Sequence, residues 1–165
     1  MVYFIADTHF SEKAIMQYEN RPFESIEEMD KEMIFRWDHI VKKEDSVYLL
    51  GDLGADGKEA SVLSQLNGDK YLVKGNHDTK SNQYYRDAGF CEVYDFPIIF
   101  KDFWILSHQP LYVNTNMPYA NLFGHVHGSP IFSTFSKQHY CVSVERIQYT
   151  PISFEEIVTT IKSGG

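Results

Sequence analysis

The sequence has no long apolar run, no internal repeat, no basic cluster and only two cysteines. Its longest apolar runs, such as Phe96–Phe100 and Phe103–Leu106, are far shorter than the ~20 residues that a membrane helix needs. No basic segment precedes the first apolar residues, so we expect neither a signal peptide nor a membrane partner. Cys91 and Cys141 form no CxxC pattern, and we interpret them as reduced thiols of a cytoplasmic protein.

Positive charge is also scarce, because the formal net charge is −8 and no basic run is longer than Lys42-Lys43. Two bound divalent cations would bring this sum only to about −4. Proteins that bind nucleic acid usually carry clustered lysine and arginine. Long nucleic acid is therefore a disfavoured partner, whereas a small phosphoester is compatible with this charge. The sequence does not indicate an oligomeric state.

The composition is that of an ordinary globular protein, with 43% apolar and 23% charged residues over 165 positions. We expect one domain over residues 1–165. Five short apolar runs predict strands, and each is followed by a polar loop: Val2–Ala6, Ser46–Leu50, Tyr71–Lys74, Phe103–Leu106 and Ala120–Phe123. Because the polar residues always follow the same end of a strand, we expect these loops to gather along one edge of a sheet.

Helices are predicted between the strands by apolar spacing and by capping residues. Ser25 and Glu28 form a possible capping box before a helix that runs to Val41, and Ser153 and Glu156 form another before a helix that runs to Lys162. Two further helices are predicted with glycine after their ends, over Lys58–Asn67 before Gly68 and over Gln83–Ala88 before Gly89. Helices alternate with strands early and strands dominate later, which predicts an α/β fold of two facing sheets with helices outside.

The loops after the strands contain five of the seven histidines together with two aspartates and an asparagine: Asp7, His9, Asp52, Asn76, His77, His108, His125 and His127. Two divalent ions held close together need a carboxylate between them and several neutral donors around them. Aspartate can bridge two ions, while imidazole and amide groups complete the coordination. The pattern therefore predicts a binuclear metal centre, and the absence of cysteine from it excludes a thiolate zinc site.

Five blocks in order resemble those of the calcineurin-like metallophosphoesterase family: Asp7-x-His9, Gly51-Asp52, Gly75-Asn76-His77-Asp78, Ser107-His108 and Gly124-His125-x-His127. Asp7-Thr8-His9-Phe10, Arg21-Pro22-Phe23 and the helix with Trp37 resemble more closely a small bacterial and phage branch. The resemblance implies a four-layered α/β/β/α sandwich of two mixed sheets. It also implies a metal-dependent hydrolase that acts on phosphate esters.

The resemblance further implies a role for each residue. Asp7, His9 and His127 would hold one ion, Asn76, His108 and His125 would hold the other, and Asp52 would bridge them. A metal-bridging hydroxide would be the nucleophile. His77 would not be a ligand but would act as the general acid, with Asp78 orienting it. The ions could be manganese, iron, nickel, zinc or cobalt, because a nitrogen and oxygen site accepts several metals.

The chain departs from the family pattern at two places. Ser11-Glu12 stands where the branch tends to have Gly-His, and Gly51-Asp52-Leu53-Gly54 supplies no phosphate-clamping arginine. The missing arginine disfavours a protein phosphatase and favours a phosphodiesterase that acts on a small or nucleotide-like ester. The alternatives are a phosphomonoesterase or nuclease of the same fold, or a non-catalytic metal-binding scaffold.

Other polar residues are open to two interpretations. Arg21 either binds a substrate phosphate or ties down its own loop beside Pro22. Tyr112, Asn114 and Asn116 either contact a leaving group or, as we prefer, have ordinary roles in a loop. His39 and His139 are expected to be surface or packed residues rather than ligands.

Overall fold

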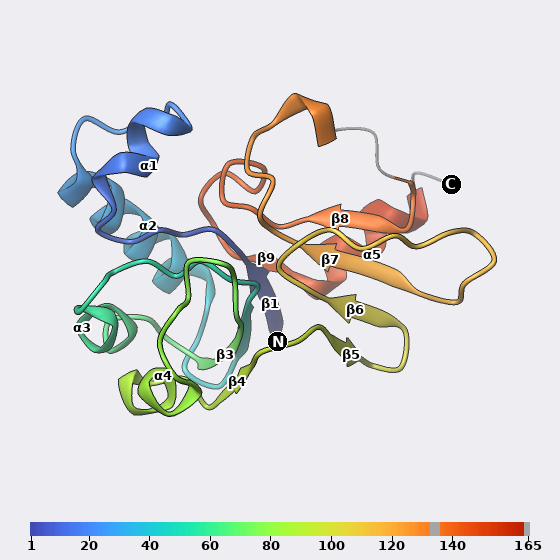
Figure 1. Ribbon diagram of the computed structural model, residues 1–165, viewed down its shortest axis with the longest axis horizontal. Coiled ribbons are helices and arrows are strands. Elements are labelled where there is room, and N and C mark those ends of the chain that lie inside the picture. Colours follow the sequence, from blue (N-terminus) through green and yellow to red (C-terminus); the bar gives the residue numbers. More distant parts are fainter. Residues whose placement is uncertain (133–135, 164–165) are drawn as a thin grey trace.

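Two mixed β-sheets lie against each other in the computed structural model, which describes residues 1–132 and 136–163 (Figure 1). The first sheet has the strand order β4-β3-β2-β1-β9, in which β9 is antiparallel to β1 and the other neighbours are parallel. Its strands are β1 Val2–Ile5, β2 Ser46–Leu49, β3 Asp69–Val73, β4 Glu92–Tyr94 and β9 Ile152–Ser153.

The second sheet has the order β5-β6-β7-β8, and only β5 is antiparallel to its neighbour. Its strands are β5 Ile98–Phe100, β6 Trp104–Leu106, β7 Ala120–Phe123 and β8 His139–Cys141. All five strands that the sequence predicts are present, within two residues at each end. The expectation of an α/β fold with two mixed sheets is confirmed.

Helices flank the two sheets (Figure 1). Four lie on the side of the first sheet: α1 Lys13–Tyr18, α2 Ile26–Ile40, α3 Glu59–Leu63 and α4 Asn82–Ala88. The last helix, α5 Phe154–Ser163, contacts β1, β8 and β9, and a short 3₁₀ helix, η1, spans Pro130–Phe132. No helix in the described part of the chain is both long and apolar enough to span a membrane.

Aromatic rings fill the contact between the sheets. Phe4, Tyr48 and Tyr71 are register partners on adjacent parallel strands, and their rings stack at 5.7 and 4.8 Å. Phe100 of the second sheet meets Phe4 edge-on at 5.8 Å. These offset and edge-on arrangements are the ones that aromatic quadrupoles favour. Much of the chain's aromatic content therefore joins the two sheets.

The opposite face of the first sheet is covered by α2. Trp37 is only 1% exposed, and its Nε1 donates to the Asn67 carbonyl at 3.0 Å. From the sheet, Tyr3 Oη donates to the Ile40 carbonyl near the end of the helix at 3.3 Å. Asp30 of α2 accepts from the backbone and the side chain of Ser11 at 2.9 and 2.7 Å, so the helix also holds the loop after β1.

The predicted helix ends are correct at three of four helices. Ser153 and Glu156 form the expected reciprocal capping box at α5, since each backbone N–H donates to the other's side chain at 3.1–3.2 Å. At α2 the Ser25 side chain accepts from Glu28 N at 3.1 Å. Helix α4 ends at Ala88, and Gly89 caps it with φ +130°.

The prediction of a helix over 58–67 is wrong in length, because α3 ends at Leu63. After Leu63 the backbone carbonyls accept from side chains and not from the N–H groups of a further helical turn. Lys70 Nζ donates to the carbonyls of Leu66 and Gly68, and Trp37 Nε1 donates to that of Asn67. Gly68, with φ +85°, therefore turns the chain into β3 rather than capping a helix. Both cysteines are free, with Cys91 exposed and Cys141 buried.

We predict that Trp37→Ala lowers the unfolding free energy by about 3–5 kcal/mol, because it empties a buried site in the core. Urea denaturation of the metal-free protein measures this change. Phe35→Ala, on the same helix at 63% exposure, is the control and should change stability by less than about 0.5 kcal/mol. Equal effects of the two substitutions would contradict the packing of α2 described above.

Candidate metal centre

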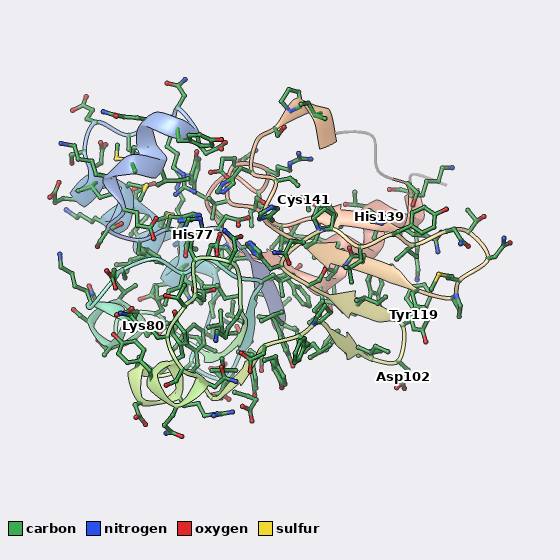
Figure 2. All side chains as sticks on the ribbon, viewed as in Figure 1. His77, Lys80, Asp102, Tyr119, His139 and Cys141 are labelled. Carbon is green, nitrogen blue, oxygen red and sulfur yellow. The ribbon has the colours of Figure 1, made fainter. Side chains whose placement is uncertain are left out.

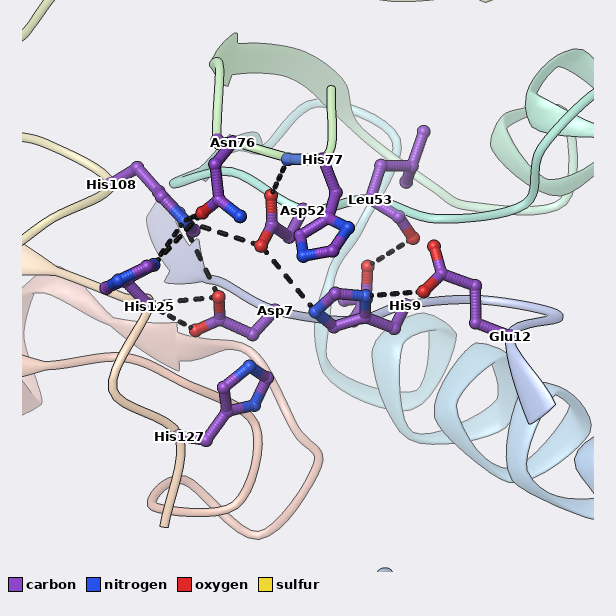
Figure 3. Close-up of polar contacts among 12 residues, drawn as sticks. Asp7, His9, Glu12, Asp52, Leu53, Asn76, His77, His108, His125 and His127 are labelled. Carbon is purple, nitrogen blue, oxygen red and sulfur yellow. Dashed lines mark hydrogen bonds and ion pairs between the residues drawn. The ribbon is translucent and has the colours of Figure 1, made fainter. Parts of the chain in front are cut away.

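The loops that follow β1, β2, β3, β6 and β7 meet at one place (Figure 3). Asp7, Asp52 and Asn76 follow three parallel neighbours of the first sheet. His108 and His125 follow two parallel neighbours of the second. The carboxyl ends of parallel strands share an edge, so this convergence is the expected consequence of the topology.

A first group of donor atoms belongs to Asp7, His9 and His127, whose potential ligand atoms lie within 4.8 Å of one another. The rings of His9 and His127 are 5.3 Å apart and nearly parallel. His9 Nε2 is buried and has no hydrogen-bond partner among the described residues. A buried polar atom without a partner costs free energy. A cation bound by this group would satisfy His9 Nε2, so these residues fit a metal.

A second group consists of Asn76, His108 and His125. Asn76 Oδ1 lies 2.8 Å from His108 Nε2 and 3.0 Å from His125 Nδ1, and the two nitrogens are 3.1 Å apart. His108 Nδ1 donates to the Leu50 carbonyl at 2.9 Å, which directs Nε2 into the group. A proton on His108 Nε2 or His125 Nδ1, or a cation bound by all three atoms, keeps their lone pairs from facing one another. This group also fits a metal.

The Asp52 carboxylate lies between the two groups. Its Oδ2 is 3.6 Å from His9 Nε2 and 3.4 Å from His108 Nε2. Asp7, Asp52 and His108 themselves form a set of donors within 4.8 Å. A ligand shared by two ions would have to occupy this position, and the bridging role of Asp52 stays a prediction.

The pKa values in the centre reflect burial and mutual charge. Burial raises the pKa of Asp7, whose side chain has no solvent exposure. Burial acts in the same direction on Asp52, but the hydrogen bond and charge of His108 outweigh it and lower the Asp52 pKa. Burial alone would lower the pKa of His108, but its bond with Asp52 raises it. The carboxylate of Asp52 thus favours the protonated form of His108, and a bound cation would compete with that proton.

The backbone of the centre is strained. Five of the seven predicted ligands have positive φ although none is glycine: Asp7, His9, Asp52, His125 and His127. Such conformations cost on the order of 1–3 kcal/mol each and persist only where the surroundings enforce them. Glycines next to the predicted ligands allow neighbouring loops to approach one another closely. A Cβ on Gly75, for example, would lie 2.1 Å from Asp52 Oδ1.

Two glutamates fix the orientation of the histidines in the first group. Glu12 Oε2 accepts from His9 Nδ1 at 2.9 Å, and Glu145 Oε1 accepts from His127 Nδ1 at 3.1 Å. A carboxylate partner on one ring nitrogen directs the other nitrogen toward a metal and makes it more basic. Glu12 is the residue that replaces the branch's histidine. Glu145 has no recognisable signal in the sequence.

Of the two interpretations of Arg21, the contacts of its side chain exclude a role in binding substrate phosphate. Its side chain has no solvent exposure, and its guanidinium donates to the Asp7 carbonyl at 2.6 Å and the Thr8 carbonyl at 2.8 Å. It also forms an ion pair with Glu145 at 2.7 Å. The guanidinium therefore cannot reach a substrate phosphate, and Arg21 instead ties the loop after β1 to the carboxylate that holds His127.

Asp78 also differs from its expected role. Its carboxylate forms no hydrogen bond or ion pair with the His77 ring but accepts three backbone N–H bonds, from Asp52 at 2.7 Å, Gly75 at 2.8 Å and Leu53 at 3.2 Å. Because residue 78 is buried beneath the loop, its oxygens meet the ends of β2 and β3 rather than the surface. Burial raises the pKa of Asp78 despite these three donors. Asp78 therefore joins two ligand loops.

His77 lies at the surface of the centre (Figures 2 and 3). Its backbone N–H donates to Asp52 Oδ1 at 2.9 Å, and its ring meets that of His9 edge-on at 5.3 Å. It lines two pockets, one of about 490 Å³ over the donor groups and one of about 390 Å³ beside it. This is the placement expected of a non-ligand histidine that faces a substrate, and its catalytic role stays a prediction.

Two further residues that the sequence analysis missed support the centre from within. Ser143 Oγ donates to Asp7 Oδ2 at 2.5 Å. Asn121, which has no exposed surface, donates to Ile105 and Ser107 and accepts from Leu111 N, so it holds the loop that contains His108. An isolated serine or asparagine in a strand region gives no signal of such a role.

Two of the remaining loop residues have the local role that we preferred. Asn114 accepts from Asn116 N in a turn, whereas Tyr112 is 86% exposed and its role in the loop stays a prediction. His39 stacks on Phe35 at the surface of α2. His139 Nε2 lies 2.8 Å from the Leu111 carbonyl.

Comparison with known proteins matches the chain to one family. The family described as calcineurin-like phosphoesterase matches residues 1–157. The uncharacterized protein MJ1445 of Methanocaldococcus jannaschii is 35% identical over 99% of this chain and 92% of its own length. The Gene 66 protein of Mycobacterium phage L5 is 32% identical over 46% of this chain and 39% of its own length.

A solved structure is similar over nearly the whole chain. The protein of unknown function AQ665 from Aquifex aeolicus superimposes with a TM-score of 0.74 at 27% identity, covering 96% of this chain and 98% of its own.

We predict that Arg21→Ala lowers the unfolding free energy by about 3–5 kcal/mol, because it leaves the buried Glu145 carboxylate without its partner. Urea denaturation of the metal-free protein measures the loss. An arginine that bound substrate would instead show unchanged stability and a raised KM, and that outcome would contradict the role assigned here.

We predict that Glu12→Ala weakens metal binding by about 10–100-fold, because His9 loses the partner that orients its ring. Calorimetric titration of the metal-free protein with Mn²⁺ measures the change. Glu32→Ala, which removes a surface partner of Arg36, is the control and should bind Mn²⁺ as the wild type does. Wild-type affinity in Glu12→Ala would show that Glu12 does not position His9.

Proposed function

Because the chain belongs to the calcineurin-like phosphoesterase family, we propose that it is a binuclear metal-dependent phosphodiesterase that acts on a small or nucleotide-like ester. Asp7, His9 and His127 would hold one divalent ion, and Asn76, His108 and His125 would hold the second. Asp52 would be shared by both. When bound, the ions would acidify a water molecule and neutralise charge on the phosphoryl oxygens.

The observation that carries this proposal is the convergence of Asn76 Oδ1, His108 Nε2 and His125 Nδ1 within 3.1 Å of one another, beside the first donor group. Three donor atoms this close together could bind one cation, and strained backbone conformations such as the five around them cluster at functional sites.

His77 is the residue of the chain best placed to donate a proton to the departing alkoxide. Its side chain is exposed and belongs to neither donor group, whereas the other four histidines of the centre contribute ring nitrogens to these groups. The backbone bond from His77 to Asp52 fixes the position of its Cα relative to the centre. The ring is thereby held at the wall that the two pockets share.

The two pockets favour a diester over a monoester. A diester has two organic groups, and pockets of about 490 and 390 Å³ meet at His77 and Glu12, which line both. A monoester dianion would need more positive charge than a diester. The larger pocket has no lysine or arginine in its lining, the smaller has only Lys80 beside four carboxylates, and Arg21 is buried elsewhere. The smaller pocket would receive the leaving group.

The matched hydrolysis of p-nitrophenyl phosphate and bis-p-nitrophenyl phosphate tests the proposal. We expect the Mn²⁺-reconstituted protein to hydrolyse the bis-ester with the higher kcat/KM and to lose activity on chelation. Preference for the monoester would identify a phosphomonoesterase. No turnover with two ions bound per chain would contradict the enzyme proposal and favour a metal-binding scaffold.

We predict that His77→Ala lowers kcat on bis-p-nitrophenyl phosphate by about 10²–10⁴-fold while the metal content is unchanged, because a general acid is lost but no ligand is. Stopped assays and elemental analysis of the same preparation measure both quantities. Loss of metal in His77→Ala would mean that the ligand assignment is wrong.

A further inference from the structure

We propose that Tyr18 is a stacking platform for a planar aromatic group, such as a nucleobase, on the ester group that the substrate retains. This inference rests on the proposed function, because it names the substrate class of the same site. Tyr18 lines the pocket of about 490 Å³ that also contains His9, Asp52, His77 and His125. Its side chain is 84% exposed although it is large and aromatic.

The exposure of Tyr18 is not explained by the packing of α1. Ile15 of the same helix is buried in the core, and Met16 packs against the core, so these residues anchor the helix. Tyr18 has no hydrogen bond or ring contact among the described residues, in contrast to Phe4, Tyr48 and Tyr71 between the sheets. A ring that contributes nothing to the fold remains available for a ligand.

The position of Tyr18 relative to Ala14 creates a surface suited to a flat group. Both residues line the pocket and are four apart on α1, so they share one face of the helix. Ile15 adds an apolar side chain to the same wall. His77 and Asn76, from the loop after β3, line the other part of the pocket. A phosphodiester at the donor groups would thus have an apolar, aromatic wall beside one of its ester groups.

The charge of this pocket argues against a retained group that carries further phosphates. Its lining contains Glu12 and Asp52 but no lysine or arginine. Additional anionic groups would meet no cationic partner there. A neutral planar ring can instead stack on tyrosine, and an interaction of this kind contributes ~1–3 kcal/mol when measured by alanine substitution. The substrate class is therefore a diester of a nucleoside or a similar aromatic alcohol.

Two diesters with the same leaving group test the inference: thymidine 5′-(p-nitrophenyl phosphate) and methyl p-nitrophenyl phosphate. They differ only in the retained group. In Tyr18→Ala we expect the ratio of kcat/KM for the thymidine ester over the methyl ester to fall by at least about fivefold, the lower end of the stacking range. Tyr18→Trp should keep the wild-type ratio, and the methyl ester should react equally in all three proteins.

Phe96→Ala is the matched control, because Phe96 is an aromatic residue at 79% exposure between β4 and β5 and lines neither pocket of the centre. It should leave the ratio unchanged. An unchanged ratio in Tyr18→Ala, or an equal loss on both esters, would overturn the inference.

A binding measurement separates failure of this inference from failure of the proposed activity. Thymidine 5′-monophosphate is titrated calorimetrically into the Mn²⁺-reconstituted protein. Weaker binding by Tyr18→Ala than by wild type supports the platform even if neither ester is hydrolysed. Equal Kd values, or no binding by the wild type, would overturn it, whereas absence of turnover alone would contradict only the phosphodiesterase proposal.

Discussion

The Asp7 carboxylate joins the two sheets at the point on which the whole centre depends. Its oxygens accept from the backbone N–H of His125, in the second sheet's loop, at 2.9 and 3.0 Å. Ser143 adds a second donor. Just before it, Ala6 pairs with residues 142 and 144 through backbone bonds. A buried carboxylate needs such partners, and here the partners belong to the other half of the molecule. The requirement to satisfy one charge therefore fixes how the ligands of the first sheet face those of the second.

The same requirement explains why the strained loops do not relax. Asp78 binds the N–H groups of Asp52, Leu53 and Gly75, so the turns after β2 and β3 hold each other in place. Arg21 binds the carbonyls of Asp7 and Thr8 and thereby holds the turn after β1. Each of these contacts provides a hydrogen-bond partner for backbone groups that, in a left-handed turn, can no longer pair with a neighbouring strand. The supporting residues thus stabilise the very conformations that aim the donor atoms inward.

The convergence of the donor residues could be predicted from the sequence because their chemistry and their place after strands are both local features. An aspartate or histidine directly after an apolar run is visible in the chain, and parallel topology then brings such residues together. The sequence could not decide between the two interpretations of Arg21 or predict the role of Asp78, because both depend on where a side chain points after the loops have folded. Arg21 resembles a phosphate ligand until the Glu145 carboxylate, 124 positions away, is seen beside it. The early end of α3 likewise depends on Lys70 and Trp37, which bind its following carbonyls.

The acidic charge of the chain and the form of its pocket have a common consequence. With a formal net charge of −8 and no lysine or arginine lining the larger pocket, long-range attraction of a polyanion is weak. Positive charge in such a centre would come from bound ions and act over a few ångströms, on the phosphoryl group alone. Any discrimination among esters must then come from uncharged contacts with the groups on either side of the phosphate. In the larger pocket, Tyr18 of α1 is a large aromatic side chain that is exposed to solvent and has no role in packing. Selectivity among esters would therefore depend on this helix rather than on the loops that hold the donor groups.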